Sequence, residues 1–98
     1  MVVISYHSLR DFIIKHPNAE GALNNWYRLV TKANWSNFNE LRGMFGSVDT
    51  IGNDRFVFNI RGNRYRLIAM IFFDVRTVYI RFVGTHDEYD KIKDCTLI

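Results

Sequence analysis

The sequence predicts an α+β fold in which helices pack on one face of a mainly antiparallel sheet. Apolar residues recur at helical spacing in the first half of the chain, and the period changes to two from Val48 onward. Two Gly-Asn pairs, at 52–53 and 62–63, separate strand-like segments. Helices followed by hairpin-connected strands are typical of α+β domains. With 98 residues, of which 48% are hydrophobic, one domain spanning residues 1–98 is expected.

The first half of the chain is expected to form three helices. Ser8 is expected to cap the first helix with Asp11 as its capping-box partner, and Pro17 ends that helix. Asn18 begins the second helix, and a short third helix is expected over 36–42. The apolar positions that define the second helix are Ala22, Leu23, Trp26, Leu29, Val30 and Ala33.

The strands and their register follow from the alternation and the turns. The expected strands are Val2–Ser5, Val48–Ile51, Arg55–Ile60, Tyr65–Phe73 and Thr77–Val83. Gly52-Asn53 and Gly62-Asn63 are expected at hairpin turns. A two-residue turn at Gly62-Asn63 pairs Ile60 with Tyr65. The simplest following turn pairs Phe73 with Val78, which places Arg66 opposite Thr85.

Paired residues share a face, so this register predicts the two faces of the sheet. The face expected to pack on the helices contains Phe56, Phe58, Ile60, Tyr65, Leu67, Ala69, Ile71, Phe73, Val78, Ile80 and Phe82. The face expected to be exposed contains Asn59, Arg61, Arg64, Arg66, Tyr79, Arg81 and Thr85.

Positive charge is concentrated in the sheet. The formal net charge is only +3, but six of the nine arginines lie between Arg55 and Arg81, with Asp74 as the single acid among them. Guanidinium groups match the geometry of phosphates and stack on bases. This concentration indicates an anionic partner, first of all nucleic acid, and the alternative is an ordinary solvated charged face.

Several classes of protein do not fit the composition. Cys95 is the only cysteine, near an expectedly loose C-terminus, so an internal disulfide is excluded and a reducing compartment is favoured. No signal peptide or long apolar run is evident, so a cytoplasmic protein without membrane contact is expected. No phosphate loop, dinucleotide fingerprint or zinc-ligand spacing occurs, so no cofactor and no metal are expected. Asp87 and Asp90 remain an alternative cation pair.

A polar cluster, THDEYDK at 85–91, follows the last strand abruptly. His86 is the candidate acid or base of this cluster, because histidine is the side chain type whose ordinary pKa lies nearest neutrality, and Tyr89 and Lys91 are further proton donors. Beside Arg66 and Arg81, these groups suit metal-free cleavage of an RNA phosphodiester. A base takes the proton of the 2′-OH, which attacks the phosphorus, while an acid protonates the leaving 5′-oxygen.

The structural alternative is that the same cluster caps a short C-terminal helix. Thr85 would be the N-cap and Glu88 its capping-box partner. The two interpretations are compatible, because a capped helix can also carry catalytic side chains.

Three segments resemble the HigB-type toxins of bacterial type II toxin–antitoxin systems, a branch of the RelE-like superfamily. They are NNWYRLVTKANWSNFNELR at 24–42, FVFNIRGNRYRLIAMIFF at 56–73 and VYIRFVGTHDEYDK at 78–91. The resemblance implies a RelE-like fold, with two N-terminal helices on a twisted antiparallel sheet. It also implies a ribosome-dependent endoribonuclease that cuts mRNA and is neutralised by a separate antitoxin.

The resemblance assigns residues position by position. The residues that match the family's N-x-x-G-N-x-x-R stretch, its last-strand arginine and its T-H-x-E-Y-D ending are Asn59, Gly62, Asn63, Arg66, Arg81, Thr85, His86, Glu88, Tyr89 and Asp90. Arg61 departs from the pattern, since the family commonly has glycine there. A side chain at this position changes the turn or adds a phosphate contact.

The sequence therefore predicts a metal-free mRNA endoribonuclease. The catalytic candidates are Arg66, Arg81, His86 and Tyr89, and the RNA-binding candidates are Asn59, Arg61, Asn63, Arg64 and Lys91. The expected partners are mRNA on the ribosome and a helix-turn-helix, HigA-like antitoxin, with operator DNA reached only through that antitoxin. The alternative is a non-catalytic module that binds RNA or protein through the arginine-rich face. Growth arrest on expression without the antitoxin distinguishes the two.

Overall fold

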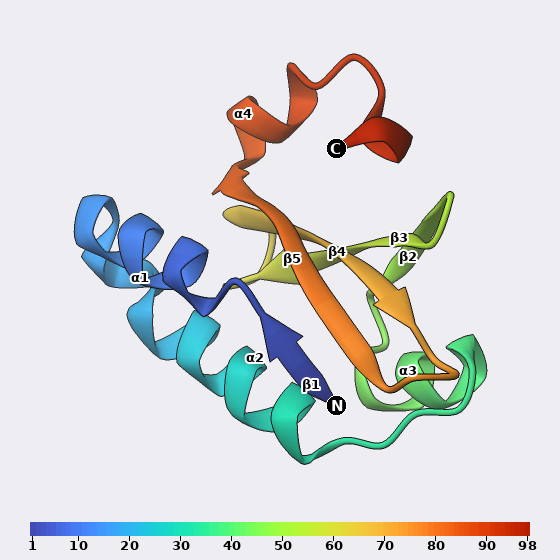
Figure 1. Ribbon diagram of the computed structural model, residues 1–98. Coiled ribbons are helices and arrows are strands. Elements are labelled where there is room, and N and C mark those ends of the chain that lie inside the picture. Colours follow the sequence, from blue (N-terminus) through green and yellow to red (C-terminus); the bar gives the residue numbers. More distant parts are fainter.

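The computed structural model describes residues 1–98, and a five-stranded sheet is its centre (Figure 1). The helices are α1 (Tyr6–Lys15), α2 (Glu20–Lys32), α3 (Phe38–Met44) and α4 (His86–Asp90), with 3₁₀ turns η1 (Pro17–Ala19) and η2 (Cys95–Leu97). The strands are β1 (Val2–Ile4), β2 (Asp49–Gly52), β3 (Arg55–Ile60), β4 (Tyr65–Phe72) and β5 (Thr77–Thr85). Their order in the sheet is β1-β5-β4-β3-β2, and only the β1–β5 pair is parallel.

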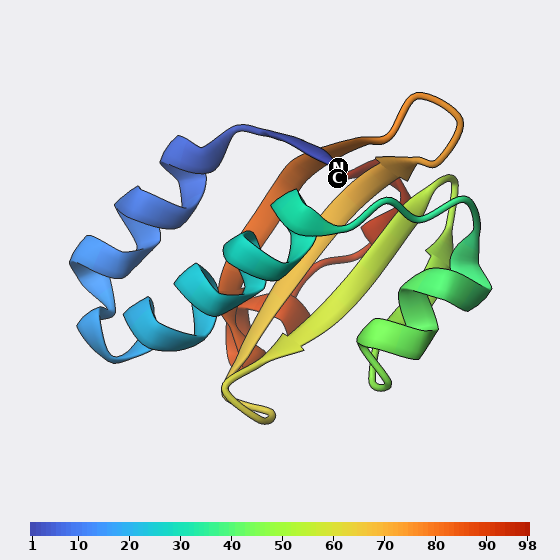
Figure 2. The ribbon, with the colours of Figure 1, turned by 90° about the horizontal axis from the view of Figure 1, so that it is seen from below.

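The hydrophobic core lies between the sheet and the N-terminal helices. Figure 2 shows α1 and α2 side by side across one face of the sheet. A cluster of 19 buried residues fills this layer, and Trp26 of α2 meets Phe58 of β3 edge to face with ring centroids 5.4 Å apart. Burial of such apolar surface is the main favourable term in folding. The predicted α+β class, with helices on one face and a short C-terminal helix, is confirmed.

The starts of the N-terminal helices differ from prediction. Helix α1 begins at Tyr6, directly after β1, and its N-cap Ser5 makes no side-chain capping bond. The predicted capping box of Ser8 and Asp11 is therefore wrong, because both residues lie inside the helix. Helix α2 begins only after the single 3₁₀ turn at 17–19.

The third helix is displaced by two residues from the prediction. It spans Phe38–Met44, not 36–42, because the side chain of Asn37 caps it by accepting a hydrogen bond from the Glu40 N–H. None of the four helices has the length and apolar character that a membrane crossing requires.

The β3–β4 register is confirmed. Ile60 pairs with Tyr65, and Asn59 pairs with Arg66. The turn between them differs in detail, because the left-handed residues are Arg61 and Gly62, with φ of 53° and 66°. In the β2–β3 hairpin, Gly52 pairs with Arg55, so the turn residues are 53–54, one position later than predicted.

The predicted β4–β5 register is wrong. Val78 pairs with Ile71, not Phe73, and the register shifts by one between Ile68 and Ala69. Ile68 faces Phe82 and Ala69 faces Ile80, so Arg81 is the extra residue of a β-bulge. After the bulge, from Phe82 to Thr85, each side chain of β5 lies on the face opposite to the predicted one.

Because of the bulge, three residues of β4 and β5 have partners or faces that differ from the prediction. Arg66 lies opposite Gly84, and Thr85 lies opposite Tyr65 on the helix side. Phe82 pairs with Ile68 on the outer face, the side away from α1 and α2, and Val83 packs against the core in its place.

The outer face is not open. Ile68 and Val57 point away from the helices, yet they are 0% and 7% exposed. Figure 1 shows α4 and the following C-terminal segment above this side of the sheet, opposite α1 and α2. The outer face is therefore covered over Val57 and Ile68, although none of the residues predicted on the exposed face is buried. The C-terminal segment, expected to be loose, is bound to the sheet by hydrogen bonds from Asn53, Arg55 and Arg81.

Candidate functional site

Helix α4 is fixed to the end of β5 by a complete capping box. The Thr85 hydroxyl accepts a hydrogen bond from the Glu88 N–H at 3.1 Å, and the Glu88 carboxylate accepts one from the Thr85 N–H at 2.8 Å. The His86 N–H donates to the Arg64 carbonyl at 3.2 Å. The helix-capping interpretation of THDEYD is thus confirmed, and the cap determines where the side chains of α4 lie.

The capping box predicts an acid-sensitive α4. The hydrogen bond from the Thr85 N–H lowers the pKa of Glu88. A carboxyl group with a lowered folded-state pKa stabilises the fold above its unfolded pKa, about 4.3. That stabilisation is lost as the pH falls through the folded-state pKa. We expect Glu88→Gln to remove this pH dependence.

Amide exchange of Thr85 and Glu88 between pH 6 and pH 3 measures the effect. Glu20→Gln, an exposed change in the first turn of α2, serves as the control. If amide exchange at Thr85 and residue 88 still speeds up at low pH in Glu88→Gln, another carboxyl group causes the effect.

Arg66 and Tyr89 form the centre of the site. The guanidinium carbon lies 5.8 Å from the centroid of the Tyr89 ring, within cation–π range. The Arg66 Nη1 atom donates to the main-chain oxygens of Asn63 and Tyr65, at 3.0 and 3.3 Å. These two hydrogen bonds hold one side of the planar Arg66 guanidinium. Its other N–H groups have no protein acceptor.

The Tyr89 phenol stays protonated at neutral pH. Its burial raises its pKa, the nearby Cys95 raises it further, and Arg66 acts in the opposite direction. A neutral phenol beside a guanidinium can donate a proton or a hydrogen bond, but it does not serve as a base at neutral pH.

The imidazole of His86 contacts the carboxylate of Asp90 one helical turn away. The distance between His86 Nδ1 and Asp90 Oδ2 is 2.8 Å, and the side chains are 47% and 55% exposed. Asp90 thereby orients the imidazole and leaves its Nε2 atom accessible. Ligand atoms of His86, Asp87 and Asp90 lie within 4.8 Å of one another, but all three residues are exposed on the surface of one short helix.

Arg81 does not lie beside Arg66. It precedes Gly84, the partner of Arg66, by three residues, which corresponds to about 10 Å along the strand. Its Nε atom donates to the main-chain oxygen of Ile98 at 3.1 Å. The structure therefore brings Arg66, Tyr89 and the start of α4 together and places Arg81 at a separate point on β5.

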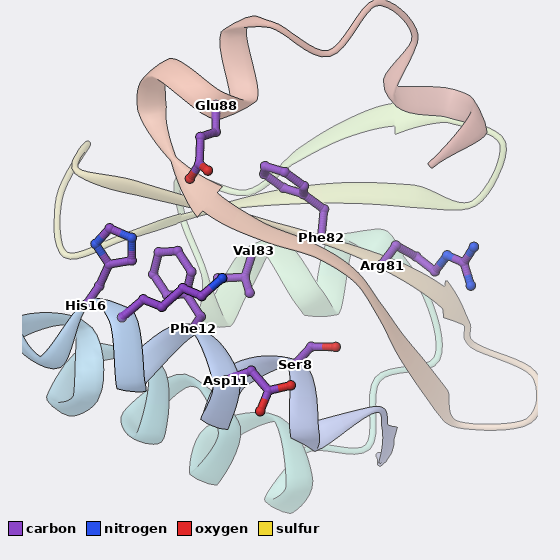
Figure 3. A pocket seen from close by; sticks show the side chains of 9 residues that line it. Ser8, Asp11, Phe12, His16, Arg81, Phe82, Val83 and Glu88 are labelled. Carbon is purple, nitrogen blue, oxygen red and sulfur yellow. The ribbon is translucent and has the colours of Figure 1, made fainter.

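A cleft of about 350 Å³ separates α1 from β5 and α4 (Figure 3). Its lining residues are Ser8, Asp11, Phe12, Lys15, His16, Arg81, Phe82, Val83 and Glu88. In Figure 3, His16 and Glu88 lie toward one end, and Arg81 extends toward the other. The lining does not include Arg66, His86 or Tyr89, so this α1 cleft flanks the predicted catalytic cluster.

The RNA-binding candidates divide into two groups. Asn63, Arg64 and Lys91 are exposed around the site. Asn59 pairs with Arg66, but together with Arg61 it also lines a hollow of about 160 Å³ bordered by α2. Arg61 is exposed where the sheet borders α2, in a left-handed turn with Gly62.

Comparison with known proteins identifies the family of this arrangement. The HigB toxin family, described as the RelE-like toxic component of a toxin-antitoxin system, matches residues 19–92. The chain belongs to the HigB toxin family. All predicted catalytic residues of this HigB-family toxin fall within the matched range, whereas the segment after residue 92 lies outside it. As the toxic component of a toxin–antitoxin system, it has an antitoxin as its partner.

Individual relatives of this HigB-family toxin are similar over most of their length. The mRNA interferase toxin HigB of Escherichia coli (strain K12) is 34% identical over 92 residues, which cover 92% of this chain and 88% of that protein. The mRNA interferase HigB of Shigella flexneri gives the same values. The mRNA interferase HigB of Escherichia coli O6:H1 is 31% identical over 94 residues, which cover 94% and 91%.

Proposed function

We propose that this HigB-family toxin is an endoribonuclease that cleaves mRNA on the translating ribosome without a metal ion. The observation that supports the proposal is the Arg66–Tyr89 contact at the start of α4, beside the His86–Asp90 pair. The site combines the guanidinium of Arg66 on β4 with the phenol of Tyr89 and the imidazole of His86, which lie about one turn apart on α4. The similarity to proteins named mRNA interferase agrees with this chemistry.

The proposed reaction balances with these groups. The imidazole of His86, oriented by Asp90, takes the proton of the ribose 2′-OH. The 2′-oxygen attacks the adjacent phosphorus, and the bond to the 5′-oxygen breaks. The Tyr89 phenol protonates that oxygen, while Arg66 stabilises the charge on the phosphate. The products are a 2′,3′-cyclic phosphate and a free 5′-OH.

The remaining candidates have supporting roles in this proposal. Asn63, Arg64 and Lys91 are exposed and guide the RNA chain by contacts with its backbone. The antitoxin partner is a helix-turn-helix protein of the HigA type, through which the complex reaches operator DNA. Arg81 binds a phosphate other than the scissile one, because the strand separates it from Arg66.

The test compares translated and free RNA. The purified protein, treated with EDTA and desalted, is added to a translation reaction, and 5′ ends are mapped by primer extension. We expect translated mRNA to be cut and naked RNA to be cut poorly, because a small positive charge holds free RNA weakly. Tyr89→Phe, which keeps the ring under Arg66 and removes the hydroxyl, should lose cleavage.

Two results would contradict the proposal. Efficient cleavage of naked RNA would remove the dependence on the ribosome. RNA binding without any cleavage, in the wild type as in Tyr89→Phe, would favour the non-catalytic module.

A further inference from the structure

Strand β5 has an unpaired edge beside α1. It spans nine residues, whereas its parallel neighbour β1 spans three and pairs only with Thr77–Tyr79. At Ser5, whose φ is 76°, the chain leaves the sheet and begins α1. From Ile80 to Thr85, no strand therefore lies on the side of β5 that faces away from β4. Such an open edge is the kind to which an extended peptide can add as a further strand.

The main-chain groups of Val83 point to this open edge. The His86 N–H donates to the Arg64 carbonyl, and hydrogen-bonded pairs recur at every second residue of an antiparallel ladder. Gly84, two residues before His86, therefore also bonds to β4. Val83 lies between these bonded positions, so its N–H and its carbonyl oxygen are directed away from β4.

Thr85 shows the same direction and marks the end of the open edge. Its N–H also points away from β4, and there it donates to the Glu88 carboxylate at 2.8 Å. The capping box thus satisfies this outward group from within the chain. Val83, two residues earlier, has no neighbouring strand or helix cap that would do the same.

The α1 cleft is a groove with this edge as one wall. Residues 81–83 of β5 all line it. Consecutive residues of a strand point to opposite faces, so three in a row line a groove only where the strand edge itself is its wall. Figure 3 shows α1 along the opposite side, where the lining residues are Ser8, Asp11, Phe12 and Lys15. Three strand residues extend about 10 Å, which sets the length of backbone that can pair there.

The lining favours a peptide over RNA. The outward N–H and carbonyl groups match the backbone of an extended peptide. Phe12 and Val83 offer an apolar contact for one of its side chains. The charged residues of the lining are Asp11, Glu88, Lys15 and Arg81. Their formal charges cancel, so the groove gives a chain of phosphates no electrostatic attraction.

The occupant has to be a single extended segment. Because α1 runs along the groove, the edge of another sheet cannot enter it (Figure 3). The outermost strands of a second copy are β1 and β2, and each is attached to its own sheet. A separate polypeptide with an extended stretch meets the requirement. The antitoxin is the protein partner that membership of the HigB toxin family assigns to this chain.

We propose that an extended segment of the antitoxin binds in the α1 cleft and adds to the sheet as a strand beside residues 81–83 of β5. Its backbone accepts a hydrogen bond from the Val83 N–H and donates one to the Val83 carbonyl oxygen. An apolar side chain of the segment contacts Phe12 and Val83. Because Glu88 belongs both to the groove and to α4, the bound segment lies beside the proposed catalytic helix. This inference rests on the antitoxin partnership and not on the chemistry of RNA cleavage.

Amide exchange followed by NMR tests the pairing. The free toxin is compared with the complex obtained by expressing the toxin together with its antitoxin. We expect the Val83 amide to exchange faster than that of Gly84 in the free toxin. In the complex it should slow by roughly tenfold or more, as a new hydrogen bond requires. Gly84 and Thr85, whose N–H groups are bonded in both states, serve as internal controls.

Val83→Pro tests the outward N–H directly. Proline is tolerated on an edge strand where its missing N–H faces away from the ladder. Val83→Ala is the matched control, because it shortens the side chain and keeps the N–H. We expect Val83→Pro to bind the antitoxin roughly two- to tenfold more weakly than Val83→Ala, the factor that one neutral hydrogen bond is worth.

Ser8→Trp tests the groove from its other wall. The indole fills the cleft beside α1, so antitoxin affinity should fall by roughly tenfold or more, the size of one lost hydrogen bond or larger. Arg10→Trp places the same ring on an exposed part of α1 outside the lining and should leave affinity unchanged. Circular dichroism verifies the fold of each variant. Should Val83→Pro fail to fold, this pair and the exchange of the wild type still decide the question.

An unchanged exchange rate of the Val83 amide in the complex would overturn the proposal, as would full antitoxin affinity of Ser8→Trp. If the Val83 amide becomes protected in the toxin alone as its concentration rises, a second copy fills the groove. If a 2′-O-methyl oligoribonucleotide protects it and the antitoxin does not, the occupant is RNA. Either result rejects the antitoxin assignment. Cleavage of translated mRNA by the free toxin is measured separately, so the proposed function stands or falls on its own test.

Discussion

Replacing Arg66 with alanine is expected to abolish growth arrest while leaving the fold intact. The guanidinium is held against Tyr89 and by two main-chain oxygens, so it is positioned before any phosphate arrives. Removing one such donor to a transition state typically costs a factor of about 10²–10³ in rate. Because Arg66 is only partly buried on the outer face, its loss leaves no cavity in the core.

Growth after induction and circular dichroism of the purified variant are measured together. Arg66→Lys keeps the charge and removes the planar fork, and we expect it to be nearly as inactive. Arg28→Ala, at an exposed arginine of α2 whose side chain donates a hydrogen bond to Asn25, serves as the matched control. Full toxicity of Arg66→Ala in a folded protein would remove Arg66 from the catalytic cluster.

Phe58→Ala is expected to cause the largest loss of stability. Phe58 is 2% exposed and meets Trp26 and Phe45 edge to face, at 5.4 and 5.3 Å between ring centroids. Truncating a buried phenylalanine to alanine costs about 3–5 kcal/mol. Small domains have an unfolding free energy of about 5–15 kcal/mol in total, so this is a large share.

Urea unfolding at 25 °C measures this loss. Val75→Ala removes apolar atoms from a position that is 62% exposed and should change the unfolding free energy by less than about 0.5 kcal/mol. A Phe58→Ala variant as stable as Val75→Ala would mean that the contact of α2 and α3 with the sheet contributes little to folding.

The β3–β4 hairpin was predictable because its signals agree with one another. Phe56, Phe58 and Ile60 alternate with other residues, and Gly62-Asn63 leaves one simple way to close the turn. The capping box was also predictable, since Thr85 and Glu88 have the required spacing and act locally. Both features depend on neighbours in the sequence.

The bulge at Arg81 was not predictable from alternation. Phe82 and Val83 are both apolar, so either can face the core, and the sequence does not show where the phase changes. The cover over the outer face was also missed, because the C-terminal segment has no strong periodicity. Its position depends on contacts with Asn53 and Arg55, more than 40 residues away.

The candidate site was predicted in part. The proximity of Arg66 to the 85–91 cluster was predicted from a β4–β5 register that is wrong by one residue at this point, and it survives because Arg66 lies opposite Gly84, next to Thr85. The prediction that Arg81 lies beside Arg66 is wrong, because it depended on the β4–β5 register.

The parallel pairing of β1 with β5 affects the order in which this toxin assembles during its synthesis. Val2 pairs with Thr77, so β1 can join the sheet only after β5, 75 residues later in the chain, has been synthesised. Non-local pairing of this kind is slow to form. Arg66, His86 and Tyr89 also come from the last third of the sequence. A nascent chain can therefore complete this edge of the sheet, and bring its candidate catalytic groups together, only after β5 and α4 have been synthesised.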